Sequence, residues 1–385
     1  MKTARDIAVL GYFHGPKLGV GVFMDRLMTM FAQNAEQSGR VVFYTNRNTL
    51  DNFTGSLEGI EVRLPLMLSL GSIPAIFWSA VVFPLICLVR RMRATLILAN
   101  PIVVLPVVKT VSVICDVSEF EIVEKYGPFR TFYRKHIMLA SAIRYSKRLV
   151  VISQFVREQL RRYFIVADRK QVDIVNLGVD VTTPEPMFVR QMLEKKGLRS
   201  DGYYLIVGRL DPRSKNLDSA LRLYKWLEEN FPGRELLLVG GINESTRREA
   251  EAFLNRIKGD PWLCSRVRYL GFVDDTELSA LYSAATATIF FSRVEGFGLP
   301  LVEAFKLGCP VIYNADCEVL RDHADGAAFA VRENDIEGRL PRDLQQFLSE
   351  RDRTDLKAKM AEVAARYDWR ACADDYLRIL DEVAQ

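Results

Sequence analysis

The sequence has 385 residues, of which 49% are hydrophobic and 26% are charged. These proportions are typical of a globular protein with a large core, so they exclude an intrinsically disordered chain, and the length predicts two or three domains. The net charge of +4 is unevenly spread, because residues 1–185 carry 23 Lys and Arg against 15 Asp and Glu, whereas the remainder carries 29 against 33. A basic first half is either ordinary surface variation or a face that meets an anionic partner such as a membrane.

The six cysteines form no Cys-x-x-Cys pair and have no metal-ligand spacing. We therefore expect free thiols, most of them buried, in a reducing compartment. The first six residues lead straight into an apolar strand, so no signal peptide is expected.

The chain begins with an apolar strand at residues 7–10, a loop with several glycines and an amphipathic helix at 22–38. This is the start of a Rossmann-like unit. It lacks the spacing Gly-x-Gly-x-x-Gly, so no dinucleotide site is expected there. Gly19 and Gly21 are either turn glycines or part of a ligand site. His14, in the same loop, is the histidine that we would test as a general base.

Residues 64–89 contain no charged side chain, and this stretch is long enough for a membrane span. Prolines and a glycine interrupt the stretch, and a buried strand follows at 95–99. If the stretch crossed a membrane, this strand would lie on the opposite side from its own sheet. We therefore expect a helix at about 74–92 that packs on the sheet and turns an apolar face toward lipid, with arginines at its end near the headgroups. A plain core helix and a true span are the alternatives.

Further strands of the first half are expected at 41–45, 60–64, 110–114, 148–152 and 172–176. The strands alternate with helices, which predicts a parallel sheet covered on both faces. A proline-containing linker at 182–186 closes this half.

The second half repeats the alternation, so the predicted class is α/β with two sheets and a ligand in the crevice between them. A final amphipathic helix at 368–383 has no strand to pair with, and we expect it to reach back to the first half. The predicted domains are residues 1–183, 184–366 and 367–385. The strands expected here cover residues 203–207, 235–239, 267–270, 287–291, 310–313 and 327–331.

The most informative stretch is residues 293–304, a glycine-rich loop that turns into a short helix after a buried strand. Glycines allow close approach of a ligand to the backbone, and the start of a helix suits a phosphate. Glu295 in the loop and Glu303 in the predicted first helical turn are better placed to accept hydrogen bonds from sugar hydroxyls. The stretch therefore predicts binding of a phosphorylated sugar.

Arg209 and Lys215 flank a strand-to-helix turn at the carboxyl edge of the second sheet, where ligands of such sheets bind. They are either two surface cations or the groups that neutralise a leaving diphosphate, and Arg213 competes for either role. Asp316 and Glu318 follow a later strand and either face the same crevice or lie in solvent.

These motifs resemble those of the family 4 (GT4) retaining glycosyltransferases over nearly the whole chain. The specific mark is Glu295 and Glu303, separated by seven residues. Residues 208–212 (Gly-Arg-Leu-Asp-Pro), followed by Lys215, are similar to the family's diphosphate loop, which is one residue longer here. Residues 151–155 and 367–369 match other common segments. The resemblance implies the GT-B fold, with two facing Rossmann-like domains and a C-terminal helix that crosses back to the first.

The resemblance also implies roles for the site residues. Arg209 and Lys215 would hold the donor diphosphate, Glu303 the ribose, and Glu295 would face the transferred sugar. Many members have His-Asp where this chain has Cys115-Asp116, which leaves that histidine's role open and makes Asp116 a catalytic candidate on the acceptor side. The other implied positions are Gly271, Phe272 and Val273 for the base, Phe297 and Gly298 for the sugar, Gly296 and Leu299 for the donor as a whole, and His14, Gly19 and Gly21 for the acceptor.

The predicted function is transfer of a hexose, of mannose or glucose type, from a GDP- or UDP-sugar to a hydroxyl of a lipid-linked or polysaccharide acceptor, with retention. We expect no metal and no other cofactor, no nucleic-acid partner, and a cytoplasmic location on the inner face of the cell membrane. O-antigen, capsule or exopolysaccharide synthesis would be the setting. A nucleotide-sugar epimerase of the same fold, a phosphorylase and a non-catalytic partner subunit are the alternatives.

Overall fold

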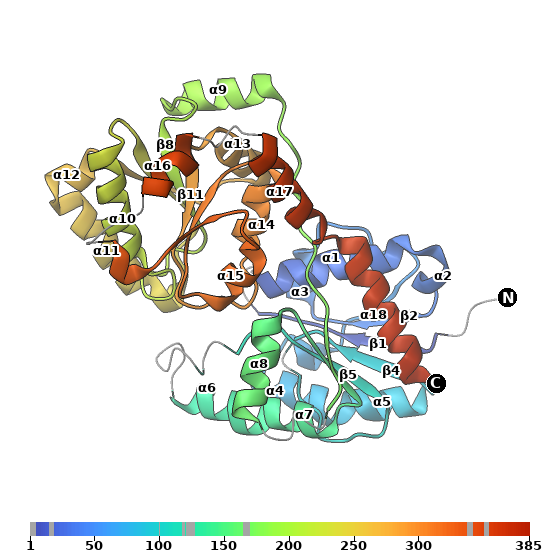
Figure 1. Ribbon diagram of the computed structural model, residues 1–385. Coiled ribbons are helices and arrows are strands. Elements are labelled where there is room, and N and C mark those ends of the chain that lie inside the picture. The colour runs from blue at the N-terminus through green and yellow to red at the C-terminus, as the bar shows by residue number, and fades with distance from the viewer. Residues whose placement is uncertain are drawn as a thin grey trace. The chain divides into compact units, whose positions relative to one another are not determined.

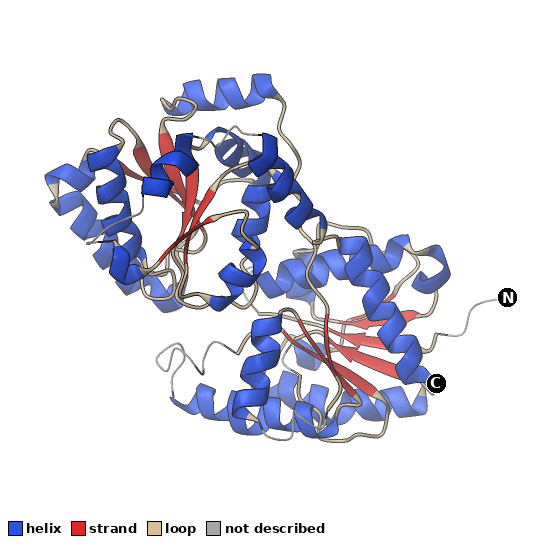
Figure 2. Cartoon of the chain, viewed as in Figure 1, coloured by secondary structure: helices blue, strands red, loops and turns tan. Residues whose placement is uncertain are grey.

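The computed structural model describes residues 5–14, 19–99, 101–117, 120, 128–164, 170–336, 342–349 and 354–385. The chain forms two compact units (Figure 1), the first made of Met1–Gly178 together with Asp368–Gln385 and the second of Val179–Tyr367. Each unit holds one parallel sheet with helices on both of its faces (Figure 2). The α/β class predicted from the alternation of strands and helices is confirmed.

The first sheet has seven parallel strands in the order β3-β2-β1-β4-β5-β6-β7. These are β1 (Ile7–Leu10), β2 (Val41–Tyr44), β3 (Glu61–Arg63), β4 (Ala94–Ile97), β5 (Thr110–Ile114), β6 (Arg148–Val151) and β7 (Val172–Ile174). Every residue of β1 is buried, and Ile7 pairs with Val41 on one side and Ala94 on the other. Burial on both faces explains why the central strands are continuous apolar runs.

The first helix differs from the predicted one, because α1 (Gly19–Gln33) begins three residues earlier and α2 (Ala35–Ser38) is separate. Gly19 and Gly21 therefore lie in the first helical turn and not in the loop, and neither has a positive φ. The other helices of this unit are α3 (Arg47–Asp51), η1 (Leu66–Leu68), α4 (Ser72–Phe77), η2 (Trp78–Val82), α5 (Phe83–Val89), α6 (Pro128–Phe132), η4 (Tyr133–Leu139), α7 (Ala140–Tyr145), α8 (Gln154–Tyr163) and α18 (Trp369–Ala384).

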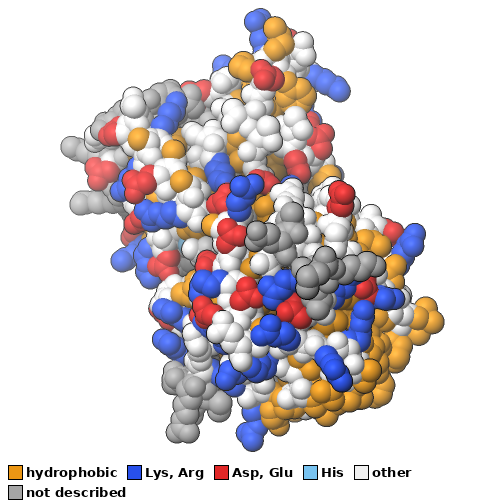
Figure 3. Space-filling model, turned by 90° about the vertical axis from the view of Figure 1, so that its right-hand side faces the viewer, with side chains coloured by type: hydrophobic (Ala, Val, Ile, Leu, Met, Phe, Trp, Pro, Cys, Tyr) orange, Lys and Arg blue, Asp and Glu red, His pale blue; other side chains and the backbone are white. Residues whose placement is uncertain are grey.

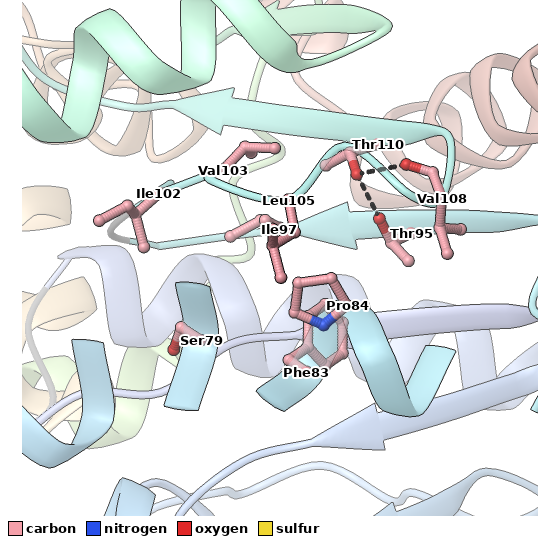
Figure 4. A pocket seen from close by; sticks show the side chains of 10 residues that line it. All are labelled: Ser79, Phe83, Pro84, Thr95, Ile97, Ile102, Val103, Leu105, Val108 and Thr110. Carbon is pink, nitrogen blue, oxygen red and sulfur yellow. Dashed lines mark hydrogen bonds between the residues drawn. The ribbon is translucent and has the colours of Figure 1, made fainter. Parts of the chain in front are cut away.

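The uncharged stretch forms one helical rod, α4–η2–α5, that lies along the first sheet. Trp78, Phe83 and Cys87 pack into the core with Tyr44 and Leu10. A cavity of about 10 Å³ remains between the rod and strands β4 and β5 (Figure 4), with room for roughly one water. Within the described residues Ser72–Val89 is the one helix long and apolar enough to cross a membrane, but packing on the sheet holds it against its own unit.

The arginine at the end of this rod has a structural role that the sequence did not predict. Arg90 donates hydrogen bonds to the Tyr44 hydroxyl at 3.0 Å and to Glu61 at 3.1 Å. It therefore fastens the rod to strands β2 and β3, and its charge is already paired within the protein. Arg91 and Arg93, which follow it, are exposed.

The second sheet has six parallel strands in the order β10-β9-β8-β11-β12-β13. These are β8 (Tyr203–Val207), β9 (Glu235–Val239), β10 (Val267–Gly271), β11 (Ala287–Phe290), β12 (Val311–Asn314) and β13 (Phe329–Val331). Its helices are α9 (Pro186–Lys196), α10 (Leu217–Asn230), η6 (Glu244–Thr246), α11 (Arg247–Gly259), α12 (Pro261–Cys264), α13 (Asp275–Ala284), α14 (Leu299–Lys306), α15 (Glu318–Ala324), η7 (Glu333–Asp335), α16 (Arg342–Ser349) and α17 (Thr354–Ala365).

The final helix α18 returns to the first unit, as its amphipathic pattern predicts, and packs against α1 and β4. Trp369 stacks on Phe23 with ring centroids 6.4 Å apart, and Arg148 of β6 forms an ion pair with Glu382. Gly178 lies directly against the start of this helix, since a Cβ there would be 2.4 Å from the backbone nitrogen of Trp369. The next residue, Val179, donates its N–H to the Tyr367 carbonyl at 3.1 Å.

Candidate functional site

The loop after β8 is held tightly against the neighbouring strand end. Gly208 has φ +135° and Gly240, which follows β9, has φ +139°. A Cβ at Gly240 would lie 1.9 Å from the Gly208 carbonyl oxygen, so both the conformation and the space require glycine. This close contact fixes the direction in which residues 209–216 leave the sheet.

Lys215 and Glu295, which are 80 residues apart in sequence, meet at this edge of the sheet. The Lys215 Nζ lies 2.5 Å from the Glu295 Oε1 and 5.4 Å from the centre of the Phe290 ring. The Arg293 N–H donates to the Ser214 carbonyl at 3.1 Å, so the backbones of the two loops are also joined. The structure thus brings together a cation and a carboxylate that the sequence assigned to the diphosphate and to the sugar.

Arg209 is the second predicted cation of the site. The Nε of Arg209 is buried without a hydrogen-bond partner, and its Nη2 lies 4.0 Å from Asp211, the carboxylate with which it is paired. The side chain is 36% exposed, so an anion can reach it from solvent. Arg213, the competitor for this role, forms an ion pair with Glu249 of α11 at 3.4 Å.

The glycine-rich loop turns into α14 at Gly298, the N-cap residue, which has φ +90°. A Cβ there would lie 2.8 Å from the Leu320 side chain. The helix starts at Leu299, with Pro300, which has no N–H, in its first turn. The Leu301 N–H donates to the Gly298 carbonyl at 3.0 Å. The partial positive charge of this helix start suits an anion, and the phosphate site stays a prediction.

Glu303 is the fifth residue of α14 and so lies just beyond the first turn in which it was predicted, because the helix begins one residue earlier, at Leu299. The Tyr282 hydroxyl donates a hydrogen bond to its carboxylate at 3.2 Å. Burial raises the pKa of Glu303 to about 7, with a smaller contribution from Asp275 in the same direction and an opposing one from Tyr282. A carboxyl with this pKa is half protonated near neutral pH, and hydroxyl ligands or a nearby cation favour its charged form.

The ring of Phe297 does not point into open space. It is 4% exposed and packs edge-on against His323, at 4.6 Å between ring centroids, and against Tyr367, at 5.5 Å. Burial lowers the pKa of His323 to about 4, so this histidine is neutral. Any contact of Phe297 with a sugar would therefore use its backbone.

The residues predicted to meet the base lie at the end of β10 and directly after it. Gly271 has φ +71°, and its carbonyl accepts a hydrogen bond from the Gly240 N–H at 2.8 Å, which ties this strand end to the turn beside Gly208. The Phe272 side chain is 82% exposed and Val273 is buried. An aromatic ring left in solvent at a strand's carboxyl end suits stacking on a planar base.

Glu333 lies at the same carboxyl edge of the second sheet, although it was not among the residues predicted from the sequence. Its carboxylate accepts hydrogen bonds from Asn216 at 3.0 Å and from Arg222 at 3.1 Å, and the Arg293 guanidinium is 3.8 Å away. Burial alone would raise the pKa of Glu333, but the hydrogen bonds from Ser219 and Asn216 and the charges of two arginines together lower it. The sequence does place a glutamate two residues after the last strand of the sheet, which could have marked it as a site residue. Its partners lie far away along the chain, so they could not be predicted.

The predicted acceptor-side residues all lie in the first unit. His14 and Gly19 are exposed, whereas Gly21 is buried in α1. Asp116 follows β5, and its carbonyl accepts a hydrogen bond from Arg134 at 3.3 Å. Asp316 and Glu318, for which the crevice and solvent were the alternatives, are both exposed in the second unit. Among the described residues there is no group of three or more His, Cys, Asp or Glu side chains that could hold a metal ion.

Comparison with known proteins agrees with this geometry. Residues 190–366 match the family model described as "Glycosyl transferases group 1". The chain is 27% identical over 265 residues to O-antigen chain mannosyltransferase B of Escherichia coli, which covers 69% of this chain and 68% of that protein. It is 31% identical over 192 residues to phosphatidyl-myo-inositol mannosyltransferase of Mycolicibacterium smegmatis, which covers 48% of this chain and 47% of that protein.

Among solved structures, the chain is similar to Anabaena HepE in complex with UDP and glucose, with a TM-score of 0.69 and 15% identity over 98% of this chain and 99% of that one. At this identity the likeness shows the fold. The second unit therefore carries a group 1 glycosyl transferase domain, and the chain is a glycosyltransferase of the GT-B fold.

Proposed function

We propose that this glycosyltransferase moves a hexose from a nucleotide diphosphate sugar to an acceptor hydroxyl with retention of configuration. The proposal rests on the contact between Lys215 and Glu295 beside helix α14, whose N-cap residue is Gly298. Cations and helix N–H groups suit the diphosphate, and the carboxylates suit the hydroxyls of ribose and hexose.

In this mechanism the bond between the sugar's anomeric carbon and the phosphate oxygen breaks, and the acceptor oxygen bonds to that carbon on the same face. The acceptor's proton passes to the leaving phosphate oxygen. Arg209 and Lys215 neutralise the charge that develops on the diphosphate, so no metal ion is required for that task. An ammonium group has three N–H donors, so Lys215 can keep Glu295 in place while it binds a phosphate oxygen.

The polysaccharide setting is supported by relatives that are named O-antigen chain mannosyltransferases. We propose mannose as the hexose and a lipid-linked or polysaccharide intermediate as the acceptor. HepE, the structural neighbour, binds UDP and glucose, so GDP and UDP donors both enter the test.

We further propose that the first unit touches the membrane through an apolar surface, defined by the exposed side chains of Ile73, Phe77, Leu85, Leu88 and Val89. These residues are 45–83% exposed on the rod α4–η2–α5. Figure 3 shows hydrophobic side chains gathered over the lower part of one face, near several Lys and Arg side chains. An apolar helix face of this kind, flanked by cations, suits a bilayer surface of anionic lipids.

The proposed activity is tested by incubating the protein with a panel of GDP- and UDP-sugars and measuring nucleoside diphosphate release with and without glycolipid acceptors. A transferase releases the diphosphate faster when the acceptor is present. An altered sugar nucleotide formed without any acceptor would identify an epimerase instead, and no turnover of any donor would favour a non-catalytic subunit.

A further inference from the structure

Glu333 joins three segments that meet at the carboxyl edge of the second sheet. One carboxylate oxygen, Oε2, accepts a hydrogen bond from the Asn216 side chain at 3.0 Å. The other, Oε1, accepts from the Ser219 hydroxyl at 2.5 Å and from Arg222 at 3.1 Å, and it lies 3.8 Å from the guanidinium of Arg293. A single carboxylate therefore links the turn after β8, the start of α10 and the loop after β11.

Asn216 has a strained backbone, and the strained residue is buried. Its φ is +50° and its ψ is 47°, a left-handed conformation that disfavours residues other than glycine. Among the described residues, three other non-glycine residues have a positive φ, namely Arg91, Asp201 and Asp325, and none of them is buried. Asn216, by contrast, is 2% exposed. Strain of this kind persists only where surrounding contacts hold it, and it occurs often at functional sites.

The Asn216 side chain does not cap the helix that it precedes. Asn216 is the N-cap residue of α10, where an asparagine usually accepts a hydrogen bond from the backbone of the first turn, but its side chain forms no such bond. Its amide donates to Glu333 instead. The negative charge of Glu333 also suits the partial positive charge at this helix start. The pairing with Glu333 thus takes the place of the usual cap and holds the left-handed turn.

The residue held in this way directly follows Lys215, whose Nζ lies 2.5 Å from Glu295. The loop that carries Glu295 is reached as well, through the contact of Glu333 with Arg293. The backbone of Arg293 donates in turn to the Ser214 carbonyl at 3.1 Å. Glu333 therefore ties together the two loops that supply the ion pair, although it is not a member of that pair.

The contacts of Glu333 show how it can act. Three hydrogen-bond donors already occupy its oxygens, and its side chain is 28% exposed. We propose that Glu333 is a positioning residue, which holds Asn216 in the left-handed turn and thereby keeps Lys215 directed at the sugar-linked phosphate of the donor. This inference rests on the proposed function and deepens it, because it adds a residue outside both loop motifs to the groups on which diphosphate binding depends.

The test compares the wild type with Glu333→Ala in calorimetric binding of GDP and UDP and of the monophosphates GMP and UMP. Loss of the carboxylate frees the turn and lets Lys215 move, so the affinity for the diphosphates should fall about 3- to 10-fold, as for one weakened hydrogen bond to a charged group. Affinity for the monophosphates, which lack the phosphate that Lys215 binds, should stay unchanged. Asp335→Ala is the control, because it removes an exposed carboxylate from the same short helix.

Asn216→Gly supplies the second arm of this test. Glycine adopts the left-handed conformation without strain and has no side-chain amide for Glu333 to hold. In this background Glu333→Ala should change the diphosphate affinity by much less than it does in the wild-type background, since the two residues act as a pair. An equal loss in both backgrounds would overturn the inference, because Glu333 would then act by another route.

The ratio of the two affinities separates positioning from a general loss of structure. Weaker binding of monophosphates and diphosphates to the same degree would overturn the inference, and so would unchanged binding of both.

Turnover gives a further reading. Glu333→Ala should lower kcat about 10- to 100-fold, as for a catalytic group that is displaced but still present, and should leave KM for the acceptor unchanged. An unchanged kcat would overturn the inference. A wild type that binds GDP or UDP but releases neither from any donor would instead reject the proposed function, and a wild type that binds no nucleotide would reject both.

Discussion

At the scale of single residues, Lys215 is the side chain whose loss we expect to reduce turnover most. Its ammonium group lies at the meeting point of two loops, next to Glu295. Lys215→Ala should lower kcat by roughly 100- to 1000-fold, the usual effect of removing one group that stabilises transition-state charge. Circular dichroism should show an unchanged fold.

The matched control for Lys215 is Arg213→Ala, from the same loop. Arg213 is paired with Glu249 on the surface of α11, so this variant should retain nearly full activity. Normal turnover by Lys215→Ala would remove that residue from the site.

Glu303 allows a prediction about pH, because burial raises its pKa to about 7 from an ordinary value of 4.5. Between these two values the folded protein keeps a proton that the unfolded chain has released. The free energy of unfolding should therefore fall as the pH rises from about 4.5 to 7, relative to the variant Glu303→Gln. Urea unfolding of both proteins across this range measures the difference. Parallel curves would show that Glu303 titrates normally.

At the scale of elements, the turn into α14 depends on one glycine. Gly298 has φ +90°, and a Cβ would lie 2.8 Å from Leu320. Gly298→Ala should destabilise the protein by about 1–3 kcal/mol and weaken nucleotide binding, because the helix start shifts. Gly19→Ala is the control, since a Cβ there meets nothing within 4 Å and the residue is already helical. If both variants bind the nucleotide equally well, the turn at Gly298 does not contribute to the donor site.

The rod α4–η2–α5 gives a prediction about membranes. Phe77→Glu combined with Leu88→Glu places charges on the apolar surface without touching the buried face of the rod. Sedimentation with anionic vesicles should fall strongly in this variant and remain unchanged in Met187→Glu, which alters an exposed apolar residue of α9. Wild-type protein that stays in solution at low salt would contradict membrane contact.

At the scale of the whole molecule, both sheets and the return of α18 follow from apolar runs and amphipathic periodicity. These patterns report burial directly, which is why the central strands are correctly predicted. The helix starts at Gly19 and Leu299 were displaced, because glycine and loop residues carry no periodic signal.

Contacts between distant residues were harder to predict. The loop motifs identified Lys215 and Glu295 as parts of one site, but no pattern in the chain indicated that Phe297 would be buried against His323. Glu333 was missed for a similar reason, because its partner Asn216 lies 117 residues earlier. Periodicity describes one element at a time, whereas these pairings depend on how elements fold together.

The return of α18 also predicts the effect of a truncation. Deleting residues 368–385 removes the stacking of Trp369 on Phe23 and the ion pair of Glu382 with the nearly buried Arg148. Arg148 keeps its ion pair with Asp173, but the deletion uncovers a large apolar surface on the first unit. We therefore expect the shortened chain to aggregate. Soluble expression with cooperative unfolding would contradict this.

The contact between Gly178 and Trp369 has a consequence for how the chain can be cut and rejoined. The whole second unit is inserted into the first, and its two ends, Val179 and Tyr367, are hydrogen-bonded neighbours. Joining Gly178 directly to Asp368 should therefore remove the second unit without disturbing the first. Each unit can then be purified alone, the second for titration with nucleotides and the first for titration with glycolipids.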